Sequence, residues 1–163
     1  MREAIEVRRL IESDADLAHQ MIPAIKWEGE SNEAPSLDSV GMRQWLANPA
    51  NVLIVAITED NLVIGFALGY LLDRIDRSRP MLCFYEIVVA SNYRRRGIGR
   101  QLVEAMKSIA GKSNATKMWV QTDLGNHAAR ALYQRAGGIE SGTPDHVYSW
   151  PEQAFSDTEI SAH

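Results

Sequence analysis

Three strand-like runs follow one another between residues 52 and 90, and they limit the possible folds more than any other feature. The run "NVLIVAITEDNLVIGFALGYLLD" predicts strands over residues 52–58 and 62–73, joined by a tight turn. After the polar connection "RIDRSRP", residues 81–90 are apolar enough to predict a central strand covered on both faces. Strands joined by short connections pair antiparallel, so this region predicts an antiparallel sheet.

The rest of the chain predicts helices and further strands around that sheet. Alternating apolar residues indicate strands, and apolar residues spaced three and four apart indicate helices. The further predicted strands are residues 4–10, 117–123, 139–141 and 147–150. The predicted helices are one beginning near Ser13, one capped by Ser36 and ending near Asn48, one from Ile98 to Gly111, and one over residues 128–135. We therefore expect a mixed α/β fold in one domain over residues 1–155, with a polar tail over residues 156–163.

Composition excludes several classes of protein. The 163 residues carry a formal net charge of −4, whereas a general nucleic-acid binder has a basic excess. The single cysteine excludes an internal disulfide and agrees with a reducing cytoplasm. No apolar run reaches the roughly 18 residues of a membrane span, no leader segment opens the chain, and the histidines lack metal-ligand spacing. We expect a cytoplasmic protein without a metal, membrane or nucleic-acid partner.

The stretch "YRRRGIGRQLVEAM", residues 93–106, places arginines where a helix begins. A cation at a helix N-terminus costs roughly 0.3–1 kcal/mol, so this turn favours an anionic ligand. Gly97 and Gly99 remove side chains from the turn, and free amides with nearby guanidinium groups suit phosphate oxygens. The alternative is a solvated basic turn with a glycine cap. The turn does not match a Rossmann motif, because Leu102 stands in the place of the third glycine. The segment before "GKS" does not match a phosphate-binding loop, because Met106 stands in the place of its first glycine.

Two motifs resemble those of the GCN5-related N-acetyltransferase superfamily. "IVVASNYRRRGIGRQLV" is similar to its acetyl-coenzyme A motif, and "NHAARALYQRAGG" to its second motif. The resemblance implies a mostly antiparallel sheet of six or seven strands with about four helices, and acetyl-CoA as cofactor. The cofactor-binding residues that it implies are Ile87, Val88, Val89, Arg94, Arg95, Arg96, Gly97, Ile98, Gly99, Arg100, Asn126, Ala129 and Tyr133. Asn126 is also predicted to cap the helix that follows it.

Two further segments, "FYEIVV" and "WVQTDLGNHAARALY", resemble the aminoglycoside 3-N-acetyltransferase branch of that superfamily. That branch has an aspartate where this chain has Glu86, which keeps the charge and lengthens its reach by one methylene. The resemblance implies transfer of an acetyl group to the 3-N position of an aminoglycoside.

Acyl transfer from a thioester to an amine needs a base, an oxyanion donor and an acid. Glu86 is the candidate base, and the alternative is a strand carboxylate that faces solvent or pairs with an arginine. The resemblance implies a backbone N–H near Val88 or Val89 as the oxyanion donor, left free where neighbouring strands splay apart. It also implies Tyr133 as the acid, although a tyrosine on a short helix is often a core residue. Cys83 lies in an apolar strand and is predicted to be a core residue, so we expect direct transfer in a ternary complex.

Acidic and aromatic residues predict a cationic small-molecule amine as substrate, because carboxylates attract a polycation and rings can stack on a sugar. The alternative is an ordinary solvated surface. Polyamines and protein amines fit the chemistry equally well, and a catalytically silent acyl-CoA-binding module is a separate alternative. A homodimer is a further expectation. The predicted substrate-binding residues are Trp27, Glu28, Glu30, Tyr85, Glu86, Asp123 and Asp145.

Overall fold

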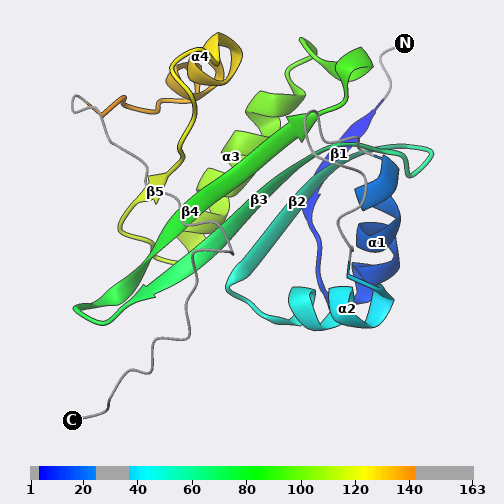
Figure 1. The fold of residues 1–163 in the computed structure, drawn as a ribbon, viewed down its shortest axis with the longest axis horizontal. Coiled ribbons are helices and arrows are strands. Elements are labelled where there is room, and N and C mark those ends of the chain that lie inside the picture. Colours follow the sequence, from blue (N-terminus) through cyan, green and yellow to red (C-terminus); the bar gives the residue numbers. More distant parts are fainter. Residues whose placement is uncertain (1–3, 25–36, 142–163) are drawn as a thin grey trace, which may run out of the picture.

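The computed structural model describes residues 4–24 and 37–141 (Figure 1). Its strands are β1 (Ile5–Arg9), β2 (Asn51–Thr58), β3 (Val63–Arg74), β4 (Arg77–Val89) and β5 (Met118–Trp119). Its helices are α1 (Ala15–Ala24), α2 (Ser39–Ala47), α3 (Ile98–Lys112) and α4 (His127–Arg135), with short 3-10 helices η1 (Glu12–Asp14) and η2 (Ser91–Tyr93). None of these helices is long and apolar enough to cross a membrane.

The sheet follows the order of the chain, β1-β2-β3-β4-β5. The first four strands pair antiparallel, and β5 lies parallel to β4 after the crossover through α3. This arrangement confirms the predicted mixed, mostly antiparallel class. The described part contains five strands rather than six or seven: residues 139–141 are not in a strand, and residues 147–150 lie outside the described part.

Alternating residues of the central strands feed two separate cores. Helix α3 covers one face, where Leu102 and Met106 pack against Ile54 and Phe84. Helices α1 and α2 cover the other face, which contains Leu53 and other residues of opposite parity (Figure 1). Because both faces are buried, the strands appear in the sequence as continuous apolar runs. We call the two sides of the sheet the α3 face and the α1–α2 face.

Element boundaries differ from the predictions at three places. Helix α2 is capped by Asp38, whose Oδ1 accepts a hydrogen bond from the Gly41 N–H at 2.7 Å; the predicted cap, Ser36, lies outside the described residues. The polar connection "RIDRSRP" mostly belongs to strands, since β3 and β4 pair as far as Arg74 opposite Arg77. An ion pair between Arg74 and Asp76 holds the tight end of that hairpin. Strand β5 is much shorter than the predicted 117–123.

Candidate active site

Within residues 4–24 and 37–141, no strand pairs with β4 beyond Cys83 on the side of β5, and we call this part of the strand its open edge. The residues of β4 that pair with β5 are Leu82 and Cys83, and the Leu82 N–H donates to the Lys117 carbonyl at 2.9 Å. Beyond Cys83, β4 continues to Val89, while the chain after β5 turns away towards α4. This is the splay that the family resemblance implied, and it leaves an edge of backbone amides facing β5.

The alternation of β4 shows which amides lie on that edge. The Ala90 N–H donates to Ile64 on the β3 side at 2.9 Å, and the Val88 carbonyl also points towards β3, because a Cβ added to Gly65 would lie 2.9 Å from it. Residues of the other parity, Ile87 and Val89, therefore face the open edge. Of the two predicted oxyanion donors, Val89 is the one whose amide faces outwards.

A β-bulge in β4 decides which way Glu86 points. Leu68 of β3 lies opposite Glu86, but the next residue, Gly69, lies opposite Phe84, so Tyr85 is an extra residue. Strict alternation would place Phe84 and Glu86 on the same face. The bulge separates them: Phe84 packs in the α3-face core, and Glu86 shares the parity of Val88, which packs on the α1–α2 face.

Glu86 lies beside a group of aromatic side chains. The ring of Tyr70 meets Tyr85 edge-on at 5.7 Å and Trp45 at 6.3 Å. Burial raises the pKa of Tyr70, and the neighbouring Tyr85, Cys83 and Glu86 raise this pKa further. Glu86 itself is half-buried. Tyr70 was not among the residues predicted from the sequence, although the spacing by two of Phe66, Leu68 and Tyr70 would have placed all three on one face.

Tyr133 lies on the other side of β4. Its ring contacts Phe84 in a T-shaped arrangement at 6.0 Å, as part of the α3-face core. Burial raises the pKa of Tyr133 above its usual 10.0, so the phenol stays protonated at neutral pH. The two candidate catalytic side chains, Glu86 and Tyr133, therefore lie on opposite faces of β4, and the open edge with its amides lies between them.

The arginine-glycine turn begins α3 in an unusual backbone conformation. Gly97 is the residue before the helix and has φ = 86°, and Arg95 has φ = 65°. Positive φ values at alternate residues turn backbone N–H groups towards one concave side, which suits an anion. A Cβ added to Gly97 would meet nothing within 4 Å, whereas one on Gly99 would lie 3.3 Å from Leu132. The first glycine leaves open space at the turn, and the second allows α4 to approach α3.

The arginines of this turn differ in their contacts. The Arg94 Nε donates to the Val89 carbonyl at 2.9 Å, which fixes the turn to the end of β4. The Arg96 guanidinium lies over the Tyr93 ring, 4.9 Å from its centre. Arg95 and Arg100 are exposed at the same turn. Open space, concave amides and concentrated positive charge fit a diphosphate.

The second motif begins α4. The Asn126 side chain accepts a hydrogen bond from the Ala129 N–H at 3.1 Å, which confirms its predicted role as a helix cap. Arg130 holds the helix to both flanking segments, through the Leu124 carbonyl at 3.2 Å and Glu140 at 2.9 Å. These contacts position Tyr133 one turn further along the helix.

Only some of the predicted substrate-binding residues lie in the described part of the chain. Tyr85 is 64% exposed on the bulge beside Glu86. Asp123 is exposed in the turn before α4, where its carbonyl accepts from the Asn126 N–H at 3.0 Å. The others, Trp27, Glu28, Glu30 and Asp145, lie outside the described residues. Within residues 4–24 and 37–141, no cluster of three acidic, histidine or cysteine side chains could hold a metal ion.

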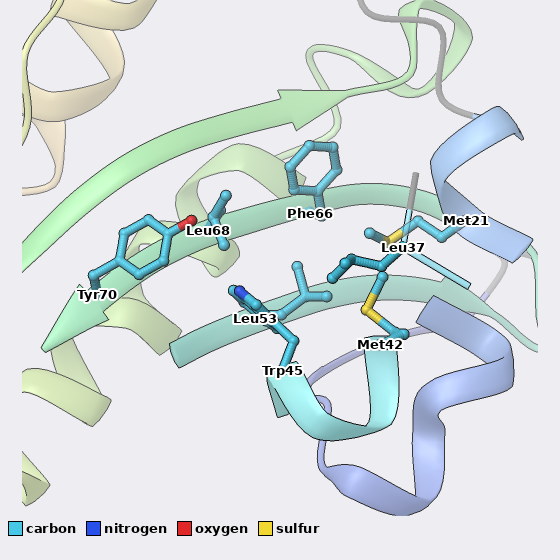
Figure 2. A pocket seen from close by; sticks show the side chains of 8 residues that line it. All are labelled: Met21, Leu37, Met42, Trp45, Leu53, Phe66, Leu68 and Tyr70. Carbon is cyan, nitrogen blue, oxygen red and sulfur yellow. The ribbon is translucent and has the colours of Figure 1, made fainter. Parts of the chain in front are cut away.

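A pocket of about 170 Å³ lies on the α1–α2 face, and Trp45 and Tyr70 of the aromatic group beside Glu86 are part of its lining. It lies between the sheet and the two N-terminal helices, with Tyr70 and Leu68 at one end and the two methionines at the other (Figure 2). Its lining residues are Met21, Leu37, Met42, Trp45, Leu53, Phe66, Leu68 and Tyr70.

Known proteins resemble this chain in fold and, more weakly, in sequence. An aminoglycoside acetyltransferase from an uncultured soil metagenomic sample, solved with trehalose, superposes with a TM-score of 0.80 at 23% identity, over 91% of this chain and 97% of that one. Aminoglycoside N-acetyltransferase AAC(6')-Iy, in complex with CoA, gives 0.71 at 18% identity, over 93% and 97%. Both likenesses concern the fold.

Curated relatives match over a shorter part. An N-alpha-acetyltransferase of Sulfurisphaera tokodaii is 31% identical over 104 residues, 57% of this chain and 62% of that protein. The chain spans between 22% and 62% of the length of the curated relatives that it matches. The sequence model of the acetyltransferase (GNAT) family matches residues 18–138. Because that match covers most of the chain and contains both motifs, the chain belongs to the acetyltransferase (GNAT) family.

Proposed function

We propose that this protein transfers an acetyl group from acetyl-CoA to the primary amine of a small molecule that is cationic in solution. Acetyltransferases of the GNAT family use acetyl-CoA. The observation that carries the proposal is the open edge of β4, which has Glu86 on one face of the strand and Tyr133 on the other. Such an arrangement lets two reactants meet at one strand from opposite sides.

The residues of the arginine-glycine turn fit the diphosphate of the cofactor. Gly97 leaves the space into which phosphate oxygens can move, and the amides of the turn point towards them. The exposed Arg95 and Arg100 supply charge-assisted donors. These contacts position the cofactor rather than react with it, and its thioester supplies the acyl group.

The amine is activated from the α1–α2 face. An ammonium group has no lone pair, so it must lose a proton before it can attack the thioester carbon. The half-buried Glu86 carboxylate takes that proton, directly or through one water. As the new C–N bond forms, negative charge develops on the acetyl oxygen, and the outward-facing Val89 N–H donates to it.

The leaving sulfur is protonated from the α3 face. The C–S bond breaks as the carbonyl re-forms, and the sulfur takes its proton from the Tyr133 hydroxyl. The nitrogen loses its second proton as the amide forms, and that proton restores the Tyr133 phenol through solvent. The raised pKa of this phenol keeps it in the protonated form that the step needs. The raised pKa of the Cys83 thiol, caused by burial, disfavours an acyl-cysteine intermediate because only the thiolate is nucleophilic. Transfer is therefore direct.

Aminoglycosides, acetylated at the 3-N position, are the acceptor class that we propose first. The fold neighbours named as aminoglycoside acetyltransferases and the "FYEIVV" resemblance support this class. The relatives named N-alpha-acetyltransferase support peptide amino termini as the second class.

The test is release of free CoA thiol from acetyl-CoA when each amine is added to the full-length protein. The panel contains aminoglycosides, polyamines, short peptides and simple amines, and a mixture without amine gives the background. We expect amine-dependent thiol release. Calorimetry with CoA separates the remaining possibilities: tight CoA binding without release from any amine would indicate a silent acyl-CoA-binding module, and no CoA binding would reject the cofactor site.

A further inference from the structure

The pocket on the α1–α2 face is apolar, which does not suit a polycation. Of the eight side chains that line it in the described part of the chain, only Trp45 and Tyr70 carry a nitrogen or oxygen atom, and none of the eight is charged at neutral pH. Met42, Leu53 and Phe66 are each at most 5% exposed, so its walls are part of the core. A charged sugar amine that entered it would lose hydration without gaining an ion pair.

The size of the pocket matches one ring or one branched aliphatic group. Its volume is about 170 Å³. An apolar protein cavity of about 150 Å³ is known to take up benzene, so the volume of this pocket is sufficient for a phenyl group. Two aromatic walls, Trp45 and Tyr70, stand edge-on to each other and present the faces and edges with which rings pack favourably.

The pocket adjoins the candidate base. Leu68 lies opposite Glu86 in the sheet, and it lines the end of the pocket that also contains Tyr70 (Figure 2). Tyr70 in turn contacts Tyr85 and lies close enough to Glu86 for that carboxylate to raise its pKa. A group that fills the pocket therefore places its neighbouring atoms beside Glu86.

We propose that the acceptor amine carries an aromatic or branched aliphatic group, which occupies this pocket while the amine reaches Glu86. The inference rests on the proposed acetyl transfer, and it favours an acceptor class other than the aminoglycosides. A free arylalkylamine and a peptide with an apolar first residue share this chemistry. Because its phenyl group is buried in the pocket, a substrate that carries such a group should have a kcat/KM roughly 10- to 100-fold higher than one that lacks it.

The experiment compares matched acceptors. Phenylethylamine is measured against ethylamine, and a Phe-Ala amide against a Gly-Ala amide, with kanamycin as the polycationic reference. A preference of about 10-fold or more for either apolar acceptor supports the pocket. Comparing the free-amine pair with the peptide pair shows whether the preferred acceptor is an arylalkylamine or a peptide with an apolar first residue. Equal kcat/KM within each pair, with acetylation of kanamycin intact, would overturn the pocket inference and leave the acetyl transfer standing.

Variants of one lining residue test the same inference independently. Met42→Phe narrows the pocket and should weaken the preference for phenylethylamine, whereas Met42→Ala enlarges the pocket and should favour a naphthyl analogue. The control is Val40→Phe on the same helix, at a position 63% exposed outside the pocket, which should leave the preference unchanged. An unchanged preference in both Met42 variants would overturn the inference, and Met42→Ala answers the question if Met42→Phe fails to fold.

Binding separates the failure of the pocket from the failure of the chemistry. Calorimetry of phenylethylamine with the CoA-loaded protein measures pocket occupation without turnover. Binding that Met42→Phe weakens, together with no thiol release, would support the pocket and reject the proposed transfer. Neither binding nor release would reject both.

Discussion

The two faces of β4 are built from very different parts of the chain. The α3 face draws its site residues from two continuous motifs, Val89–Arg100 at the start of α3 and Asn126–Tyr133 in α4. The α1–α2 face assembles its pocket from α1, α2, β2 and β3, with Glu86 added from β4. A motif can encode the first face because its geometry is local. The second face exists only once four elements have packed together.

This difference predicts that substitutions on the two faces separate in their effects. Substitutions on the α1–α2 face should alter the preference for the acceptor or the removal of its proton by Glu86. Substitutions at the arginine-glycine turn should alter the affinity for the cofactor. The predictions below run from the largest expected effect to the smallest.

Glu86→Gln should have the largest effect. It keeps the shape of the side chain and removes the base, so kcat at pH 7 should fall roughly 10²- to 10³-fold. The CoA dissociation constant should remain unchanged, because Glu86 lies on the α1–α2 face. Steady-state kinetics and calorimetry measure the two quantities. Unchanged turnover would remove Glu86 from the role of base, and weakened CoA binding would contradict the separation of the faces.

Tyr133→Phe should slow transfer about 10-fold, since it removes one donor at a position where water can partly replace it. Because burial raises the Tyr133 pKa above 10.0, the wild-type rate should show no alkaline decline from this group below about that pH. Rates between pH 6 and 10 test both points. If the variant were as fast as the wild type, the proton would come from solvent.

Gly97→Ala should weaken CoA binding by roughly 10-fold, and its effect on stability should be modest. A side chain at φ = 86° costs about 1–2 kcal/mol, and its Cβ would occupy the open space that we assign to the diphosphate. Gly111→Ala is the matched control in the same helix, because its Cβ also meets nothing within 4 Å and no positive φ is required there. Equal CoA affinity in both variants would place the diphosphate elsewhere.

Asp14→Asn should have the smallest effect, limited to stability. Asp14 accepts two hydrogen bonds from Arg8, at 2.9 and 3.0 Å, and one from the Ile11 N–H, which together fix η1 to β1. The Arg8 side chain is 34% exposed, so we expect a loss of only about 1 kcal/mol in the free energy of unfolding.

The pH dependence of this loss has a definite sign. The Arg8 hydrogen bond holds the Asp14 pKa below its ordinary value of 3.8. The stabilisation is therefore fully present above that value and disappears as the pH falls through the lower, folded-state pKa. Thermal melts of wild type and Asp14→Asn should differ at pH 7 and converge in strong acid. A constant difference would mean that the carboxylate charge does not matter.

Much of the fold could be predicted because its signals are local. Apolar runs with polar turns predicted β2, β3 and β4, and helical spacing predicted α3 and α4. Asn126 was predicted as a cap because its side chain bonds a backbone group only three residues away. The predicted strand at residues 139–141 was wrong: these residues are not in a strand, and Glu140 instead pairs with Arg130 of α4 at 2.9 Å.

The direction of Glu86 could not be predicted in the same way. The segment "MLCFYEIVV" gives no sign that Tyr85 is an extra residue, because a bulge is a property of two paired strands. Gly99 illustrates the same limit: its absent side chain makes room for Leu132, from a helix about thirty positions away. The pocket was missed for the same reason, because its lining residues come from α1, α2, β2 and β3.

The sequence by itself determined the strands and helices, the family motifs and the positively charged turn, because these depend on residues within a few positions of one another. Tertiary structure alone decided that β5 stops after two residues, that the bulge turns Glu86 to the α1–α2 face, and that an apolar pocket lies beside it. Those three features depend on strand register and on packing between distant segments, and register is specified by which side chains become buried when the elements pack together.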